Sequence, residues 1–232
     1  MIKKIVFSLL FILLSVALYA YSNKNSNLDT QVSTRNLLAI SWQNAFCQTH
    51  QKKRECRNVK RTDFSATHFT LHGLWPQPRN NTYCKPTKKL WLNPSLYNEL
   101  LHVMPAAKSG LHQHEWKKHG TCYNTTPERY FRDSIDLLQQ VNSSYIRDFF
   151  VRHIGSKVTI KQVRMAFDKA FGKGSGRKVK MQCKSGYITE LQINLEGDIS
   201  KAKTLSTLLK NAPMAHNGCQ KGLIDRVGFG LR

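Results

Sequence analysis

The sequence predicts a single α+β domain cross-linked by disulfides, and three observations lead to this class. Segments with strand-like alternation and segments with helical spacing of apolar residues both occur between residues 37 and 232. No internal repeat or composition break divides that range. Six cysteines follow an apolar N-terminal run, and an even count in an exported chain favours structural bridges.

The N-terminus has the pattern of an export signal. Two lysines precede an apolar run over residues 5–18, which is short for a membrane span and matches a signal-peptide core. Small residues suited to cleavage follow, so we expect residues 1–22 to be removed and the chain to be periplasmic or secreted. An uncleaved anchor is the alternative, although stable membrane insertion is not expected after cleavage. A polar leader (23–36) then precedes the domain (37–232).

The charge of the chain indicates a polyanionic partner. It has 36 lysines and arginines against 14 acidic residues, a formal net charge of +22. Nucleic acid is the leading partner class, and anionic membrane or glycan surfaces come second. A charge that serves only solubility is the remaining alternative.

The cysteines have no pair at the C-x-x-C spacing of zinc or redox sites. Three structural bridges are therefore expected, with fifteen pairings open. The simplest local pairing closes the short basic loop between Cys47 and Cys56. The other four cysteines are Cys84, Cys122, Cys183 and Cys219.

A half-buried strand is predicted at Thr67–His72. Phe69 and Leu71 would face the core, and the alternate residues, His72 among them, would face a cleft. The glycine after His72 permits close backbone approach, and residues 73–76 should end the strand. Upstream, residues 37–42 should form a buried strand that leads into a helix at about Gln43.

Turn and capping signals divide the rest of the domain. Helices are expected over residues 93–104, 126–141, 144–153 and 159–172, the last with a capping box. Strands are expected over residues 179–183, 187–195 and 223–229.

The most informative stretch is residues 114–122. As an α-helix, it would place four reactive side chains within about 140° of arc: His114, Glu115, Lys118 and His119. Trp116 would point away toward the core, and Gly120 would end the helix. Two imidazoles, a carboxylate and an ammonium are costly to bury unpaired, so this face indicates the wall of a site.

Acid–base chemistry suits this face better than metal chemistry. Its histidines are five residues apart, whereas a zinc-protease helix places them four apart, and Glu115 is the only acid between Glu99 and Glu128. We therefore expect no metal and no cofactor. Two histidines can divide acid and base roles near neutral pH, and Lys118 can stabilise a developing phosphorane. RNA carries its own nucleophile, the 2′-hydroxyl, so the pattern indicates an RNA-cleaving enzyme.

Residues 68–76 and 114–122 closely resemble the two active-site segments of the ribonuclease T2 family, and Leu37–Cys47 resembles its first strand and helix. The resemblance implies an α+β fold with a central antiparallel sheet and flanking helices. It also implies an exported, acid-type endoribonuclease that cleaves single-stranded RNA with little base preference and without metal. Cleavage would proceed through a 2′,3′-cyclic phosphate to a 3′-phosphate.

The resemblance assigns roles position by position. His119 resembles the base, His72 the acid, and Lys118 with Glu115 the pair that stabilises the pentavalent phosphate. His114 resembles a phosphate-binding residue. Their structural alternatives are an i,i+3 ion pair for Lys118 and Glu115, and a site-shaping role for His114.

Substrate binding and the remaining disulfides also follow from the resemblance. Trp75 resembles a wall of the first base pocket, and Tyr83 is a second wall or an exposed loop tyrosine. Some family members have an acid at the position of Gln77, so no purine preference based on that acid is expected here. Cys84 would pair with Cys122, and Cys183 with Cys219.

The rival to an enzyme is a non-catalytic RNA-binding or host-interaction protein on the same fold. Against it, every catalytic position of the resemblance is filled. We expect a monomer. Three glycosylation sequons, at Asn80, Asn124 and Asn142, would matter only in a eukaryotic secretory route.

Overall fold

The computed structural model describes residues 31–87, 89–202, 204–216 and 218–228. The predicted signal segment and most of the polar leader lie outside the described residues, as does Phe229. None of the helices that the structure does describe combines the length and apolar character needed to cross a bilayer.

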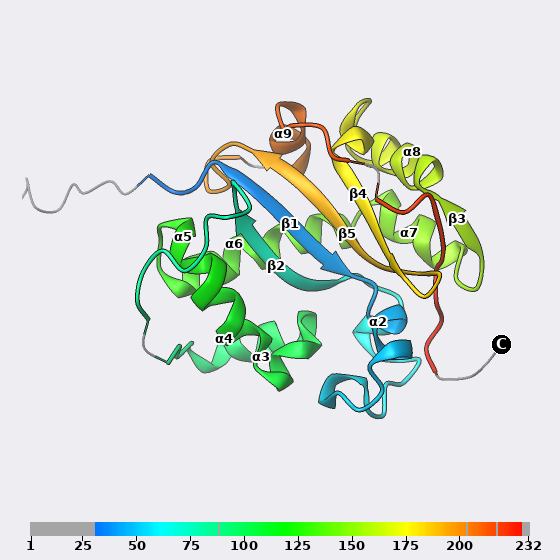
Figure 1. The fold of residues 1–232 in the computed structure, drawn as a ribbon, viewed down its shortest axis with the longest axis horizontal. Coiled ribbons are helices and arrows are strands. Elements are labelled where there is room, and N and C mark those ends of the chain that lie inside the picture. Colours follow the sequence, from blue (N-terminus) through cyan, green and yellow to red (C-terminus); the bar gives the residue numbers. More distant parts are fainter. Residues whose placement is uncertain (1–30, 88, 203, 217, 229–232) are drawn as a thin grey trace, which may run out of the picture. The chain divides into compact units, whose positions relative to one another are not determined.

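A sheet of six strands forms the centre of the described domain (Figure 1). Its order is β2-β1-β5-β6-β3, and β4 also pairs with β5. All pairs are antiparallel except β5 with β6, which touch in parallel at Tyr187 and Leu223. The predicted central antiparallel sheet is confirmed. The strands are β1 (Arg35–Ser41), β2 (Thr70–Pro76), β3 (Lys157–Thr159), β4 (Val179–Lys184), β5 (Tyr187–Glu196) and β6 (Lys221–Leu223).

Helices cover one face of this sheet. In Figure 1, α6 and α7 pass behind the strands, and no helix crosses in front of β1, β5 and β4. The larger helices are α3 (Pro94–Val103), α6 (Pro127–Asn142), α7 (Tyr145–Arg152) and α8 (Ile160–Phe171). The shorter ones are α2 (Gln43–Thr49), α4 (Leu111–Glu115), α5 (Thr121–Tyr123) and α9 (Leu205–Lys210).

The caps explain why the long helices begin where the sequence predicts. The side chains of Asn93 and Thr126 each accept an N–H from the first turn, with proline at the next position. Thr159 and Gln162 complete the predicted capping box of α8. The sequence did not predict α9 or the short strand β3.

The strand that carries His72 is displaced from its predicted range. It begins at Thr70 and continues through Pro76, because β1 supplies a pairing partner as far as Asn36. An extended residue before proline suits this continuation, and β2 is an edge strand, where proline is tolerated. Phe69 instead bonds the side chain of Asn142 through its N–H.

The prediction of a strand over residues 223–229 is wrong in its described part. The strand β6 ends at Leu223, and residues 224–228 have no strand pairing. The carbonyl of Asp225 accepts hydrogen bonds from the side chains of Trp42, at 2.7 Å, and Asn44, at 3.5 Å. Side-chain donors thus satisfy this backbone, which an alternating sequence pattern does not show.

All six cysteines are paired as expected. The bridges join Cys47 to Cys56, Cys84 to Cys122, and Cys183 to Cys219. The first closes a local loop on α2, and the second ties the loop after β2 to the short helix α5.

Candidate active site

A β-bulge presents His72 to the open face of the sheet. Ile40 of β1 lies opposite Leu71, and the next residue, Ala39, lies opposite Gly73. His72 is therefore the extra residue of β2 at this point. Bulges bend a strand and redirect a side chain, and they are common beside active sites.

The second active-site segment is not the uniform helix that was predicted. The chain passes from α4 into a π-helical turn, Trp116–Gly120, and then into α5. The N–H of Thr121 bonds the carbonyl of Trp116, which is the i to i+5 pattern of a π-turn. His114 lies in α4 before this turn and His119 lies within it, and the charge of His114 acts on His119.

Gly120 was expected to end the helix, but it does not. The helical path continues to Tyr123 and stops at Asn124, which has a left-handed φ of 66°. Gly120 is needed for another reason, because a Cβ there would lie 2.2 Å from a ring carbon of Trp116. Trp116 is buried in the core, as predicted.

Gly73 allows the two segments to meet. A Cβ at this position would lie 2.1 Å from Oε2 of Glu115, so only glycine leaves room for that carboxylate. The indole Nε1 of Trp75 donates a 2.7 Å hydrogen bond to the same oxygen. The predicted close approach beside His72 is thus between strand backbone and a side chain of α4.

Two carboxylates surround the imidazole of His72. Its Nδ1 lies 2.5 Å from Oε2 of Glu190, and its Nε2 lies 3.8 Å from Oε1 of Glu115. Burial acts to lower the pKa of His72, but the hydrogen bond and charge of Glu190, with the charge of Glu115, outweigh it and raise that pKa. His72 is therefore held toward its protonated form.

The surroundings of His119 shift its pKa in the opposite direction. Its side chain is buried and stacks on the Trp75 ring with centroids 5.3 Å apart. Burial, followed by the positive charges of Lys118, His114 and His72, lowers the pKa of His119 to about 3. Among the described residues its Nδ1 has no hydrogen-bond partner. His119 is thus neutral over the whole range in which an imidazole acts as a base.

The charge of Lys118 acts on both His72 and His119, and the charge of Glu115 acts on His72. Burial raises the pKa of Glu115, while His72, the Trp75 N–H and Lys118 oppose that rise. Lys118 also acts to lower the pKa values of His72 and His119 through its charge. The structure records no ion pair between Glu115 and Lys118, so the simple i,i+3 salt bridge is not what is found among the described side chains.

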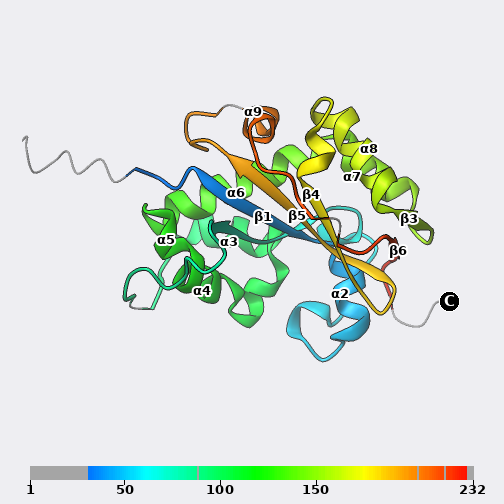
Figure 2. The ribbon, with the colours of Figure 1, turned by 45° about the horizontal axis from the view of Figure 1, so that its top comes forward.

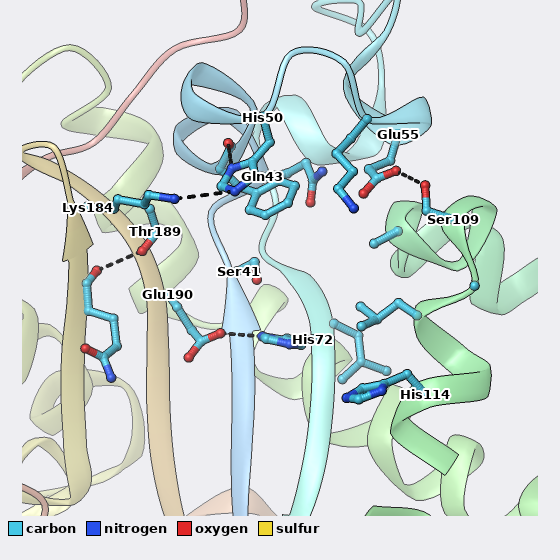
Figure 3. Close-up of a pocket in the computed structure, with 17 residues that line it drawn as sticks. Ser41, Gln43, His50, Glu55, His72, Ser109, His114, Lys184, Thr189 and Glu190 are labelled. Atoms are coloured by element: carbon cyan, nitrogen blue, oxygen red, sulfur yellow. Dashed lines mark hydrogen bonds and ion pairs between the residues drawn. The ribbon is translucent and has the colours of Figure 1, made fainter. Parts of the chain in front are cut away.

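An open cavity of about 480 Å³ lies on one side of His72 (Figure 3). His114 enters it from α4, and burial, Lys118 and His72 lower the His114 pKa. His72 and Glu190 form its floor, and Lys184 and His50 approach within 3.4 Å at its far wall. The lining also includes Ser41, Gln43, Phe46, Lys53, Glu55, Leu71, Ala106, Ser109, Gly110, Leu111, Gln182 and Thr189.

The residues predicted to form the base pocket, Trp75 and Tyr83, lie on the other side of His72. Trp75 and Gln77 line a second cavity of about 160 Å³. Tyr83 is not among the residues lining either cavity, and 53% of its surface is exposed. It is nevertheless anchored, because its N–H donates to the carbonyl of Lys118 at 2.8 Å. The Cys84–Cys122 bridge secures the loop next to Tyr83.

Sequence reasoning did not identify Glu190. It lies on the predicted strand 187–195, whose outward residues are polar while the alternate ones are buried. That polar alternation was the available signal for a face lining a site. Its partner could not be identified, because His72 lies 118 residues earlier in the chain.

The described residues contain no group of three or more His, Cys, Asp or Glu side chains arranged to hold a metal ion. The described site offers proton donors, proton acceptors and the ammonium group of Lys118. These groups suit charge and proton transfer at a phosphodiester.

Comparison with known proteins agrees with this geometry. The model of the ribonuclease T2 family matches residues 34–207, a range that holds both active-site segments. The chain belongs to the ribonuclease T2 family. It is therefore an endoribonuclease by family, as the residue pattern predicted.

Relatives of this T2 ribonuclease include bacterial and plant proteins. Ribonuclease I of Escherichia coli (strain K12) is 29% identical over 260 residues, covering 94% of this chain and 97% of that protein. Extracellular ribonuclease LE of Solanum lycopersicum is 29% identical over 148 residues, covering 56% and 62%.

Solved structures share the fold of this T2 ribonuclease. The RNase-related protein from Calystegia sepium superimposes with a TM-score of 0.60 at 19% identity, covering 84% of this chain and 98% of that one. The SF11-RNase of Nicotiana alata gives 0.59 at 18% identity, covering 83% and 98%. These matches establish the α+β fold predicted from the sequence.

Proposed function

We propose that this T2 ribonuclease cleaves single-stranded RNA by metal-free transphosphorylation, with His119 as base and His72 as acid. The observation that carries the assignment is the divergence of the two imidazoles. The pKa of His119 is lowered to about 3, and that of His72 is raised above its ordinary value. Environments that push two titratable groups apart in this way separate acid from base.

In the first step, neutral His119 removes the proton of a ribose 2′-hydroxyl. The 2′-oxygen attacks the adjacent phosphorus, and the bond from phosphorus to the 5′-oxygen breaks. His72 donates its proton to that departing oxygen, which leaves a 2′,3′-cyclic phosphate. Both substrate oxygens need an imidazole within hydrogen-bond reach, and Trp75 lies against both rings, at centroid distances of 5.2 and 5.3 Å.

The second step reverses the two roles. His72, now neutral, takes a proton from water, and the resulting hydroxide attacks the cyclic phosphate. The bond from phosphorus to the 2′-oxygen breaks, and His119 returns its proton to that oxygen. The product is a 3′-phosphate, and both histidines regain their starting states.

Charge on the pentavalent phosphate would be stabilised by Lys118 and His114. The charge of Lys118 acts on the pKa values of four site residues, His72, His114, Glu115 and His119, so Lys118 lies near the reacting atoms. Glu115 supports the arrangement by holding the Trp75 N–H and facing Nε2 of His72. Trp75 and Tyr83 offer stacking surfaces, which tolerate any base, so base preference should be low.

Export to the periplasm or outside the cell is also proposed. Three disulfides suit an oxidising compartment, and one relative is named as extracellular. The chain would act as a monomer. Mass spectrometry of the mature N-terminus would test signal removal, and a chain that keeps residue 1 would contradict it.

Analysis of RNA ends in excess chelator tests the reaction. The purified protein should give cyclic phosphate and then 3′-phosphate ends, and His119→Phe should abolish both. The matched control is His153→Phe, because this histidine directly follows α7, lies outside the site and should leave cleavage unchanged. Cleavage only with added divalent metal, or 5′-phosphate ends, would contradict the mechanism. RNA binding without cleavage would favour the non-catalytic alternative.

A further inference from the structure

The face of the sheet that no helix covers continues well beyond His72. Side chains alternate along strands, so Glu190, Gln192 and Asn194 of β5 share one face while the residues between them are buried. Glu190 lines the cavity beside His72, whereas Gln192 and Asn194 line the cavity beside Trp75. From Glu190 to Asn194 the face advances about 13 Å.

A third and larger cavity, of about 570 Å³, shares a lining residue, Met214, with the cavity beside Trp75. Four of its lining residues are cationic, and none of its described lining residues is acidic. The cations are Lys173, Arg177, Lys178 and Lys210. The other lining residues are Phe171, Gly172, Gly174, Ser175, Ser206, Thr207, Leu209 and Met214. We call this the basic cavity.

The wall of the basic cavity is a fixed structure. Asp168 of α8 accepts the N–H groups of Gly174 and Gly176, at 3.0 and 2.8 Å. A Cβ at Gly176 would lie 2.1 Å from the carbonyl oxygen of Arg164, so glycine allows the loop to pack directly on α8. The Asp168 carboxylate is therefore engaged with backbone amides, while Lys173 and Arg177 on the loop are exposed.

Positive charge in this cavity is not neutralised by the protein. None of the ion pairs between described residues includes Lys173, Arg177 or Lys210. All three side chains are exposed. Burial and the adjacent charge of Arg177 lower the pKa of Arg164, which shows cations held side by side. Such a cluster attracts an anion with several negative charges.

The basic cavity adjoins the cavity beside Trp75. Met214 lines both and is 63% exposed. The segment after α9 runs along β4 toward β6 in both views of the fold (Figures 1 and 2), and Ala215 bonds the carbonyl of Arg177 at 2.8 Å. Arg79 and Lys180 line the cavity beside Trp75 and add positive charge there. An RNA strand that extends from Trp75 toward the basic cavity would therefore pass Met214 and stay beside cationic side chains.

We infer that the basic cavity is a remote subsite that binds the phosphodiester backbone of a single-stranded RNA whose scissile bond lies at His72. The inference rests on the proposed site and extends it. RNA is favoured over an anionic lipid surface because the cations line a concavity that adjoins the Trp75 cavity at Met214, whereas a membrane needs an outward-facing patch. The enzyme should therefore prefer polynucleotides to dinucleotides.

The test compares two substrates in one charge-reduced variant. The triple variant Lys173→Ala/Arg177→Ala/Lys210→Ala should lose about tenfold in kcat/KM on an RNA of about 16 nucleotides. It should keep the wild-type kcat/KM on a dinucleoside monophosphate, which is too short to reach the cavity. The matched control is Lys60→Ala/Lys157→Ala/Lys161→Ala, which removes three equally exposed charges elsewhere.

Salt dependence gives a second readout. Binding of the same RNA to a His119→Phe background should weaken with salt, and the triple change should reduce the log–log slope by about two. Equal effects of the triple variant and its control on the long RNA would overturn the subsite. The subsite would also be overturned if the triple variant lost the same factor in kcat/KM on both substrates. It would likewise be overturned if the triple variant lost binding to phosphatidylserine vesicles while its RNA cleavage was unchanged. Failure of wild-type protein to cleave the dinucleotide would instead count against the proposed mechanism.

Discussion

Nδ1 of His72 and Oε2 of Glu190 meet at 2.5 Å although the two residues belong to strands that do not pair. The strand β1 runs between them. Its residues on the open face alternate as Leu37, Ala39 and Ser41, so the two at this point are small. Ala39 has no exposed surface. The bulge and these small residues together let the carboxylate reach the imidazole across β1.

Glu190→Gln should shift the pH profile. Glu190 raises the pKa of His72 by favouring the imidazolium, so its removal should lower that pKa. The acid must be protonated, and therefore the alkaline limb of kcat/KM should move to lower pH, with activity at neutral pH reduced. The acid limb, set by His119, should not move. Measurement of kcat/KM from pH 3 to 9 checks this.

A matched change separates this effect from a loss of stability. Glu196→Gln also removes a carboxylate from β5, at the end of the strand where it pairs with Arg35 at 3.4 Å, away from His72. If it leaves the alkaline limb in place while Glu190→Gln moves it, Glu190 acts through its contact with His72. An unmoved alkaline limb in Glu190→Gln would show that the hydrogen bond has no effect on the acid.

The sequence was sufficient for much of this site and insufficient at identifiable points. Local signals predicted the capped helices, and the resemblance predicted His72, Glu115, Lys118 and His119 as one group. The π-turn at Trp116–Gly120 escaped prediction because the segment was given a regular helical period and Gly120 was interpreted as a helix stop, whereas Gly120 leaves room for the Trp116 ring. Glu190 and the bulge escaped because strand register depends on pairing between distant segments.

Lys118→Ala should lower kcat about 10² to 10³-fold, since one preorganised charge near a developing oxyanion is worth that much. It should also move the acid limb to higher pH. Lys118 lowers the pKa of His119, so without it the imidazole becomes easier to protonate. Lys117→Ala is the control, because that neighbouring lysine is exposed and should leave both values unchanged. If the two variants had the same kcat and the same acid limb, Lys118 would have no role in the mechanism.

Gly73→Ala should lower kcat about a hundredfold with little effect on folding, because a displaced group of about 1 Å is enough for such a loss. The new Cβ would overlap Oε2 of Glu115 and move the carboxylate away from Trp75. Shortening that side chain should relieve the overlap. The double variant Gly73→Ala/Glu115→Asp should therefore lose less than the product of the single losses. If the double variant instead lost the full product of the two single losses, residues 73 and 115 would not interact.

The two long disulfides should affect stability alike and catalysis differently. Cys84–Cys122 and Cys183–Cys219 span 38 and 36 residues, so removing either by double alanine substitution should cost about 4 kcal/mol of unfolding free energy. Only the first bridge secures the turn that carries Lys118, through the bond from the Tyr83 N–H to the Lys118 carbonyl. On a dinucleotide substrate, kcat should therefore fall in Cys84→Ala/Cys122→Ala and stay near wild type in the other variant. Denaturant titration and initial rates measure both quantities, and equal kcat values would show that the turn holds its geometry without the bridge.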